Sequence, residues 1–261
     1  MADIIYITVI LIATTLGAIA GIGGGVLFKP VFDAIGDYSA SQVSVISSSA
    51  VFAMSLVSVV ISTKQIREQK EQLKAMLPLA VGACAGGWLG EFIFSKFTAS
   101  DSLIRIIQNI ILLILIIFVI IYMKNENKKS LNRKEWYTAV LTGLALGCVS
   151  AFLGIGGGPI NVAVITLVFG LEIKNAVIGS LMTILFAQGT KLISVAAKDV
   201  SAFNLKLLPF VIIAGILGAL LGRTINKKVN DKAVNSCFIA VQVIIIILCI
   251  FNIVKYTFTT P

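Results

Sequence analysis

Apolar residues fill long runs of this chain, and short clusters of polar and charged residues separate the runs. Several runs approach 20 residues, the length that an α-helix needs to cross about 30 Å of hydrocarbon at 1.5 Å per residue. The pattern therefore predicts an all-α membrane protein. The apolar segments are residues 4–20, 26–36, 41–63, 75–95 and 102–123, followed by 136–153, 159–170, 174–197, 203–223 and 231–255.

The composition supports this class of protein. Charged residues make up 13% of the chain and the mean hydropathy is +1.01, whereas soluble domains carry about 25% charged residues. The net charge of +9 comes mostly from loops, where Lys and Arg set membrane orientation. We therefore expect the chain to contact membrane lipid and to bind no nucleic acid. With no histidine and four isolated cysteines, we expect no metal, no cofactor and no enzymatic activity.

The motif GIGGG occurs at residues 21–25 and again at 154–158, each time inside apolar sequence. The same shift of 133 residues carries Ser47 to Ser180 and Gly82 to Gly215. Two homologous halves explain these matches. We assign residues 1–123 to a first transmembrane repeat, 124–135 to a cytoplasmic linker and 136–261 to a second transmembrane repeat.

Each glycine-broken segment can be arranged in two ways. If it is a discontinuous helix that crosses the membrane once, the chain has eight spans. If it is a re-entrant hairpin that returns to its own side, each half adds three full transmembrane helices and the halves are inverted repeats. The hairpin arrangement collects more Lys and Arg on one face, so the positive-inside rule favours it. It places both termini outside the cell.

Three consecutive glycines interrupt a helix, since each costs about 1 kcal/mol relative to alanine, and they let the backbone approach a ligand. The half-helix that follows offers unpaired N–H groups and a partial positive charge, which favour an anion. Close helix packing is the alternative use of such glycines. We predict that these glycines bind the substrate: Gly23, Gly24, Gly25, Gly156, Gly157 and Gly158.

Two lysines inside apolar segments are further candidate ligands. Lys191 lies near the centre of its segment, where a charge costs roughly 2.5 kcal/mol or more, so it needs a partner or a task unless it snorkels to the interface. Lys29 follows the first glycine break, and Asp33 one turn later can simply neutralise it. Asp33 and Glu91 are the acids nearest the membrane interior, and the sequence assigns neither as a proton carrier.

The segment 41–63 is rich in serine. Six of its serines recur on one helical face and form a serine stripe: Ser41, Ser44, Ser48, Ser55, Ser58 and Ser62. This stripe can line an anion path with hydroxyl groups, or it can pack as small residues against a neighbouring helix. Ser47 is a stronger candidate for substrate binding because it matches Ser180 across the repeat. The remaining predicted substrate ligands are Ser47, Ser48, Asn161, Ser180, Thr183 and Gln188.

The doubled GIGGG, the serine-rich segment, the stretch NAVIGS at Asn175 to Ser180 and the two-half layout resemble the TauE/SafE sulfite exporter family. The resemblance covers nearly the whole chain. It implies a secondary carrier for small sulfur-containing anions such as sulfite, thiosulfate or sulfoacetate.

Together these features predict a carrier that holds its anion near the midplane between the two repeats and works by alternating access. A passive anion channel and a carrier for a non-sulfur carboxylate stay open as alternatives. A coupling ion, H⁺ or Na⁺, is a possible second partner. We expect a multi-pass protein of a bacterial plasma membrane; the oligomeric state is left open.

Overall fold

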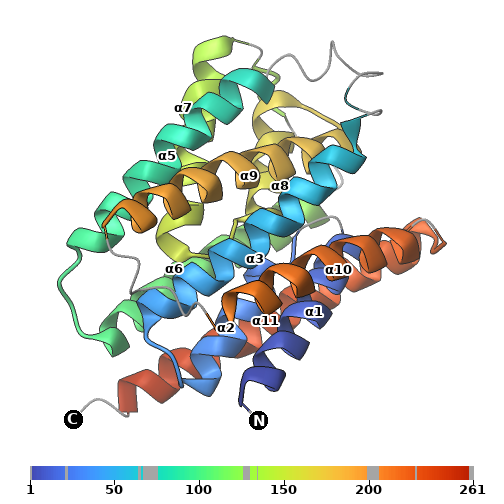
Figure 1. Cartoon of the computed structure of the whole chain (residues 1–261). Helices are drawn as coiled ribbons and strands as arrows, with labels where there is room; N and C mark the ends of the chain where they lie inside the picture. Colours follow the sequence, from blue (N-terminus) through green and yellow to red (C-terminus); the bar gives the residue numbers. More distant parts are fainter. Residues whose placement is uncertain are drawn as a thin grey trace.

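The computed structural model describes residues 2–20, 23–63, 66, 76–125, 130–133, 135–198, 206–226 and 228–258. Within these residues the chain forms ten α-helices and no β-strand (Figure 1). The first half contains α1 (Ala2–Ile19), α2 (Gly25–Ile35), α3 (Ala40–Ile61), α5 (Met76–Lys96) and α6 (Asp101–Lys124). The second half contains α7 (Trp136–Leu153), α8 (Gly158–Phe169), α9 (Ile173–Lys198), α10 (Leu208–Asn226) and α11 (Asp231–Phe258).

Seven of the described helices are long and apolar enough to cross a membrane. They are α3, α5 and α6 in the first half and α7, α9, α10 and α11 in the second. The apolar part of α1, and all of α2 and α8, are shorter. The structure confirms the predicted all-α membrane class, and its helices coincide with the ten apolar segments to within a few residues.

Local sequence signals explain several helix ends. The Ser39 side chain accepts a hydrogen bond from the Gln42 N–H, and the Gln42 side chain accepts one from the Ser39 N–H, so a capping box starts α3. At the C-terminal ends of α7 and α8, Gly154 and Gly170 adopt φ values of +65° and +68° and terminate the helices. Glycine takes this left-handed conformation without a Cβ penalty, which is why it ends helices so often.

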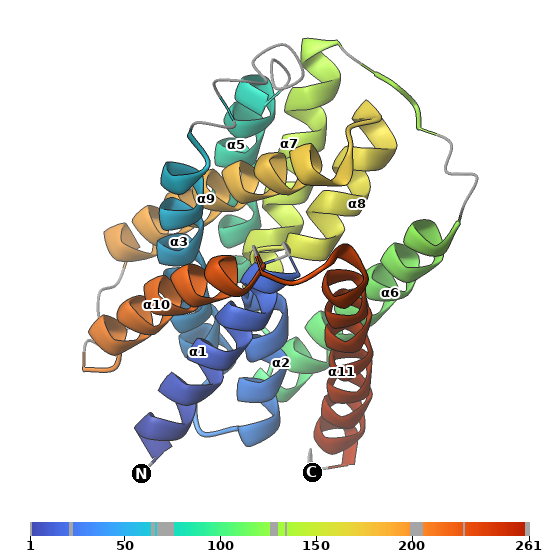
Figure 2. The same cartoon turned by 90° about the vertical axis from the view of Figure 1, so that its right-hand side faces the viewer.

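Each glycine-broken segment returns to the end of the molecule at which it began (Figure 2). The Tyr6 hydroxyl, near the start of α1, donates a hydrogen bond of 3.0 Å to Asp37, just after α2. In the second half, the backbone N–H of Leu131, shortly before α7, donates to the carbonyl of Leu167 at the end of α8 over 2.8 Å. The pairs α1–α2 and α7–α8 are therefore hairpins in which the glycines form the bend.

The two hairpins enter from opposite ends of the molecule. The end of α11 reaches the end of α2, where the Tyr256 hydroxyl donates to the Asp33 carbonyl over 2.5 Å. The N- and C-terminal helix ends consequently share one end of the molecule, which we call the terminal end (Figures 1 and 2). Residues 130–133 beside α8 mark the opposite end, which we call the linker end.

The halves pack on each other reciprocally. Helix α5 of the first half lies against α7 and α9 of the second, and α10 of the second half lies against α1 and α3 of the first. Glycines allow both close crossings. A Cβ at Gly86 would collide with the Leu144 carbonyl of α7, and one at Gly218 would collide with Thr14 of α1.

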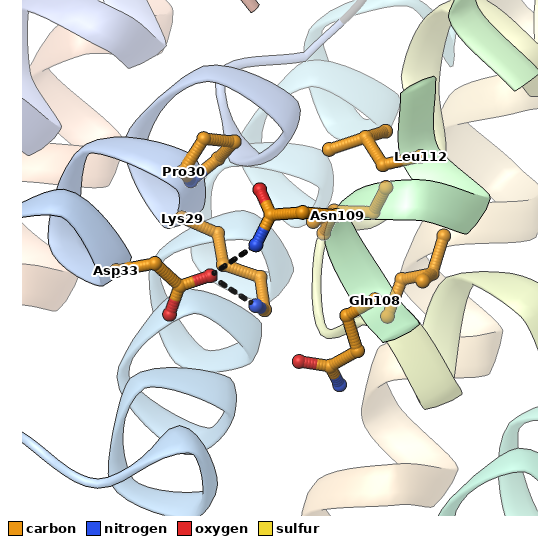
Figure 3. Close-up of a pocket in the computed structure, with 8 residues that line it drawn as sticks. Lys29, Pro30, Asp33, Gln108, Asn109 and Leu112 are labelled. Atoms are coloured by element: carbon orange, nitrogen blue, oxygen red, sulfur yellow. Dashed lines mark hydrogen bonds and ion pairs between the residues drawn. The ribbon is translucent and has the colours of Figure 1, made fainter. Parts of the chain in front are cut away.

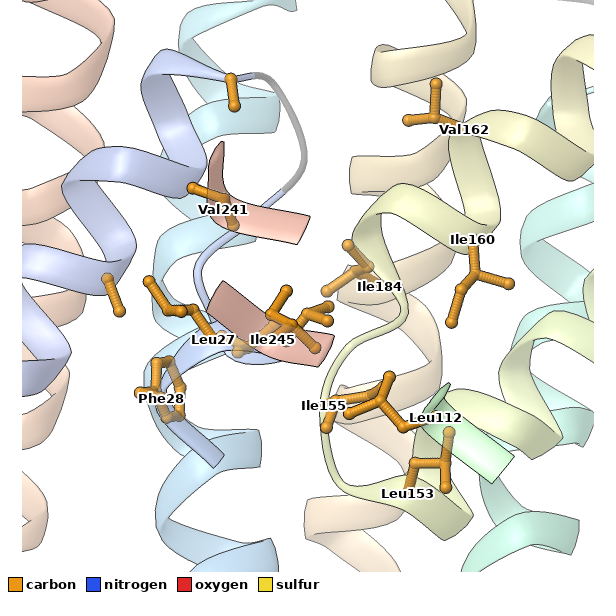
Figure 4. Packing of buried hydrophobic residues seen from close by; sticks show 14 of the residues in the cluster. Leu27, Phe28, Leu112, Leu153, Ile155, Ile160, Val162, Ile184, Val241 and Ile245 are labelled. Carbon is orange, nitrogen blue, oxygen red and sulfur yellow. The ribbon is translucent and has the colours of Figure 1, made fainter. Parts of the chain in front are cut away.

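The apolar core occupies the space between the two hairpins (Figure 4). Leu27 of α2 and Ile160 of α8 lie on either side of Ile155, which belongs to the second glycine break, and Ile184 of α9 lies beside it. Large apolar side chains such as Ile114 and Ile121 point outward from α6 and are exposed. An exposed apolar surface of this kind suits a hydrocarbon environment.

Candidate anion site beside the second glycine break

The two glycine breaks contact each other near the centre of the protein. A Cβ added at Gly25 would collide with the Ile155 carbonyl and with Val51 of α3. Gly23 and Gly156 both have positive φ, at +75° and +72°, and a Cβ at either residue would contact Ile184 of α9. The predicted glycine ligands are therefore brought together, but apolar side chains occupy the space immediately between them in this conformation.

The break after α7 frees backbone carbonyl groups, because the last four carbonyls of a helix have no intrahelical partner. Side chains from three other helices donate hydrogen bonds to these carbonyls. The donors and acceptors are Gln188 to Ser150, Lys191 to Ala151, Gln108 to Phe152 and Ser47 to Gly154. Three of the predicted ligands thus serve here to hold the second break.

Other predicted ligands are bound in the same region. The Ser180 hydroxyl donates to the Gly158 carbonyl over 3.3 Å, and the Asn161 amide donates to the Gly156 carbonyl over 3.4 Å. The Thr183 hydroxyl instead donates to Gly179 in its own helix, as a structural threonine does. The structure therefore gathers Ser180 and Asn161 around the break, whereas it ties Thr183 to α9.

Several buried oxygens near this break find no hydrogen-bond partner within the described part of the chain. The Ser150 hydroxyl and the Asn161 amide oxygen both face Gly157. The Gln188 amide oxygen and the Ser48 hydroxyl are unpartnered as well. Leaving such a group buried costs about 1–3 kcal/mol, so these oxygens mark a place where water or a ligand can supply partners.

Lys191 is fully buried and does not snorkel to the surface. Its Nζ donates to the Ser44 hydroxyl over 2.5 Å and to the Ala151 carbonyl over 2.8 Å, and it lies 5.9 Å from the centre of the Phe94 ring. Among the described residues, no carboxylate lies within ion-pair distance of this ammonium group. The partial negative charge at the C-terminal end of α7 contributes to stabilising it.

A pocket at the terminal end lies next to Lys191. Its volume open to the centre of a water molecule is about 70 Å³, whereas one water needs roughly 10–15 Å³. Ser44, which accepts a hydrogen bond from Lys191, is part of the wall. The lining residues are Ser41, Ser44, Val45, Glu91, Phe94, Ser95 and Val195. We call this space the Lys191 pocket.

Lys29 has a different environment (Figure 3). Its Nζ donates to the Asp33 carboxylate over 2.7 Å, which confirms the neutralisation considered from the sequence. The other oxygen of Asp33 accepts a hydrogen bond of 2.6 Å from Arg105 of α6, and the Asn109 amide lies 3.5 Å from the first. The adjoining space, bounded by Gln108 and Ile155, leaves no room for a water molecule.

Sequence reasoning missed part of the Lys191 pocket. Ser44 belongs to the predicted serine stripe, yet nothing local separated it from Ser55, which bonds to its own helix. Glu91 was noticed as a membrane acid without a role. No signal in the sequence points to the Ala151 carbonyl, because any residue supplies the same backbone acceptor.

The fold and this site define a class: a multi-helix membrane protein with two glycine-broken hairpins and a buried lysine beside the second break. The sequence model of the family described as Sulfite exporter TauE/SafE matches residues 6–249. The chain belongs to this family, which is a family of membrane transporters. Comparisons with curated proteins and with solved structures returned no match.

Proposed function

We propose that this protein is a secondary carrier for small sulfur-containing anions such as sulfite, thiosulfate or sulfoacetate. One observation carries the proposal: the buried Lys191 ammonium group donates to Ser44 in the wall of a pocket with room for a small molecule, and no carboxylate lies within ion-pair distance of it in the described chain. A positive charge in that position attracts an anion, because interactions in a low-dielectric interior are only weakly screened. The sulfur chemistry of the substrate comes from the family.

The two halves, residues 1–123 and 136–261, are inverted repeats in this proposal, joined by the linker at 124–135. Three features support the inversion. The hairpins enter from opposite ends, and the halves pack reciprocally. In addition, Glu91 and Arg223 end the similar stretches GGWLGE (residues 86–91) and GALLGR (residues 218–223), and they lie at opposite ends of α3, near Ser44 and Ser62 respectively.

Alternating access then requires the hairpins to rearrange around an anion near the midplane. In the present conformation Ser47 and Gln188 hold carbonyls of the second break. Movement of the break would release these donors together with the N–H groups at the start of α8. The unpartnered oxygens of Ser48 and Asn161 would then gain partners as polar groups or water enter.

The linker end faces the cytoplasm of a bacterial plasma membrane in this proposal, and both termini are extracellular. Basic residues support this orientation: Arg133 precedes α7, Lys174 starts α9 and Arg223 ends α10, all at the linker end. Cytoplasmic loops carry an excess of such residues.

The test is thermal unfolding of the detergent-solubilised protein with sulfite, thiosulfate, sulfoacetate, sulfate, acetate and chloride at matched ionic strength. A ligand at about 100 times its dissociation constant adds roughly 2.7 kcal/mol to the free energy of unfolding. We expect one of the sulfur anions to raise the melting temperature and Lys191→Met to remove the rise. Lys174→Met, at the exposed start of the same helix and far from the pocket, is the matched control and should keep it.

A response to acetate alone would indicate that the substrate is a carboxylate and not a sulfur anion. If the folded protein responded to none of these anions, the proposed anion site would be wrong. Counterflow in proteoliposomes separates carrier from channel. An outward gradient of unlabelled anion should drive accumulation of labelled anion through a carrier, whereas a channel lets both equilibrate.

A further inference from the structure

The Lys191 pocket contains a carboxylate as well as a cation, and the two have different positions in it. Glu91 lines the pocket from α5 and is 5% exposed. Its carboxylate lies 4.0 Å from the ammonium group of Lys198 at the end of α9, and the charges of Glu91 and Lys191 attract each other. The acid therefore stands between the buried ammonium group and the terminal end.

An anion in this pocket would share Lys191 with Glu91. If Glu91 were ionised, two like charges would compete for one buried cation in a space of about 70 Å³. Like charges that share a site disfavour joint ionisation strongly. Binding a proton to Glu91 removes the competition and turns the carboxylate into a hydrogen-bond donor for the anion.

We propose that Glu91 is the proton site of this transporter, so that anion and proton bind together in the Lys191 pocket. The inference rests on the proposed function and adds H⁺ as the coupling ion. The proton comes from water at the terminal end, joins a Glu91 carboxylate oxygen when the anion binds and leaves when the anion dissociates. A carrier built in this way moves anion and proton in the same direction.

The surroundings of Glu91 contain few other titratable groups. Helix α9, packed on α5, contributes Lys191 and Lys198. Helix α7, on another face of α5, brings Cys148 against Gly90, and Lys96 follows on α5 itself. Helix α3 contributes the hydroxyls of Ser41 and Ser44 to the pocket. Glu91 is the carboxyl group of this set, and a proton on it would remove the one acidic side-chain charge that lines the pocket.

The experiment measures thiosulfate affinity against pH by calorimetry or thermal unfolding, since thiosulfate keeps its charge between about pH 5.5 and 8.5 while sulfite does not. Wild-type affinity should fall as pH rises, by up to about tenfold per pH unit for one coupled proton. Glu91→Gln, which mimics the protonated acid, should bind thiosulfate with little pH dependence. The control Glu172→Gln, an exposed acid at the start of α9, should behave like the wild type.

Proton uptake gives an independent readout in weakly buffered protein with a pH-sensitive dye. Adding thiosulfate should draw protons from solution with the wild type and with Glu172→Gln, but not with Glu91→Gln. If Glu91→Gln binds thiosulfate with the same pH dependence and uptake as the wild type, the proton site is wrong and the anion carrier stands. If folded wild-type protein binds none of the tested anions at any pH, the proposed function itself fails.

Discussion

Lys29 and Lys191 are both buried inside the membrane region, yet the protein treats their charges differently. Lys29 pairs directly with Asp33, and Arg105 and Asp101 extend the pair into an alternating chain of charges. Lys191 has only a hydroxyl and a carbonyl as hydrogen-bond acceptors within the described residues. A buried lysine that is paired with a carboxylate stabilises the structure, whereas a buried lysine held only by neutral hydrogen-bond acceptors stays available to an anion.

The largest expected effect concerns the buried ion pair of Lys29 and Asp33. Asp33→Asn leaves Lys29 and Arg105 buried without their shared counter-charge, and breaking a buried pair in this way costs about 3–5 kcal/mol. Asp101→Asn is the matched control, because Asp101 also binds Arg105 but its side chain is 48% exposed. The control should cost less than about 1 kcal/mol. Equal losses for both variants in denaturant unfolding would contradict the structural role of the Lys29 group.

A smaller difference separates the two lysines themselves. Lys29→Met should lower the free energy of unfolding by about 1–3 kcal/mol, since Asp33 keeps Arg105 as a partner. Lys191→Met should stay within about 1 kcal/mol of the wild type, because the two lost hydrogen bonds are offset by the removal of a buried charge. Unfolding curves of the two variants measure this. A larger loss for Lys191→Met would make Lys191 a structural residue.

The smallest predicted effect concerns anion binding in the Lys191 pocket. Ser44→Ala removes a hydroxyl that holds the ammonium group and lines the pocket, so thiosulfate binding should weaken by roughly three- to tenfold. Ser55→Ala is the control, since Ser55 is buried on the same helix and bonds only to the Phe52 carbonyl in the described structure. Equal affinities for the two variants would remove Ser44 from the site.

How far the sequence predicts this site depends on the distance over which each contact acts. The Lys29 and Asp33 pair was foreseeable because it joins residues four apart on one helix. Arg105 joins the same carboxylate from 72 residues away, and the serine that holds Lys191 is 147 residues distant. No local pattern encodes such partners, so the isolated positions of Lys29 and Lys191 in apolar sequence looked alike.

The serine stripe shows the same limit on one helix. Its spacing correctly indicated a shared face, but Ser55 and Ser58 bond to their own helix, while Ser41 and Ser44 line the pocket. The division depends on where α5 and α9 meet the start of α3 around the pocket. Spacing sets the face of a helix, and the crossing helices set which part of that face meets a cavity.

The sequence alone was enough to predict the membrane class, the ten helical segments and the two glycine breaks. These features follow from hydrophobic length and from the conformational freedom of glycine, and both act within one segment. The tertiary structure alone shows that the hairpins meet at Gly25 and Ile155, that Arg105 joins the ion pair of Lys29 and Asp33, and that Lys191 lies next to a pocket. Those outcomes depend on which helix ends come together, because buried charges are stabilised by whatever groups packing brings within a few ångströms.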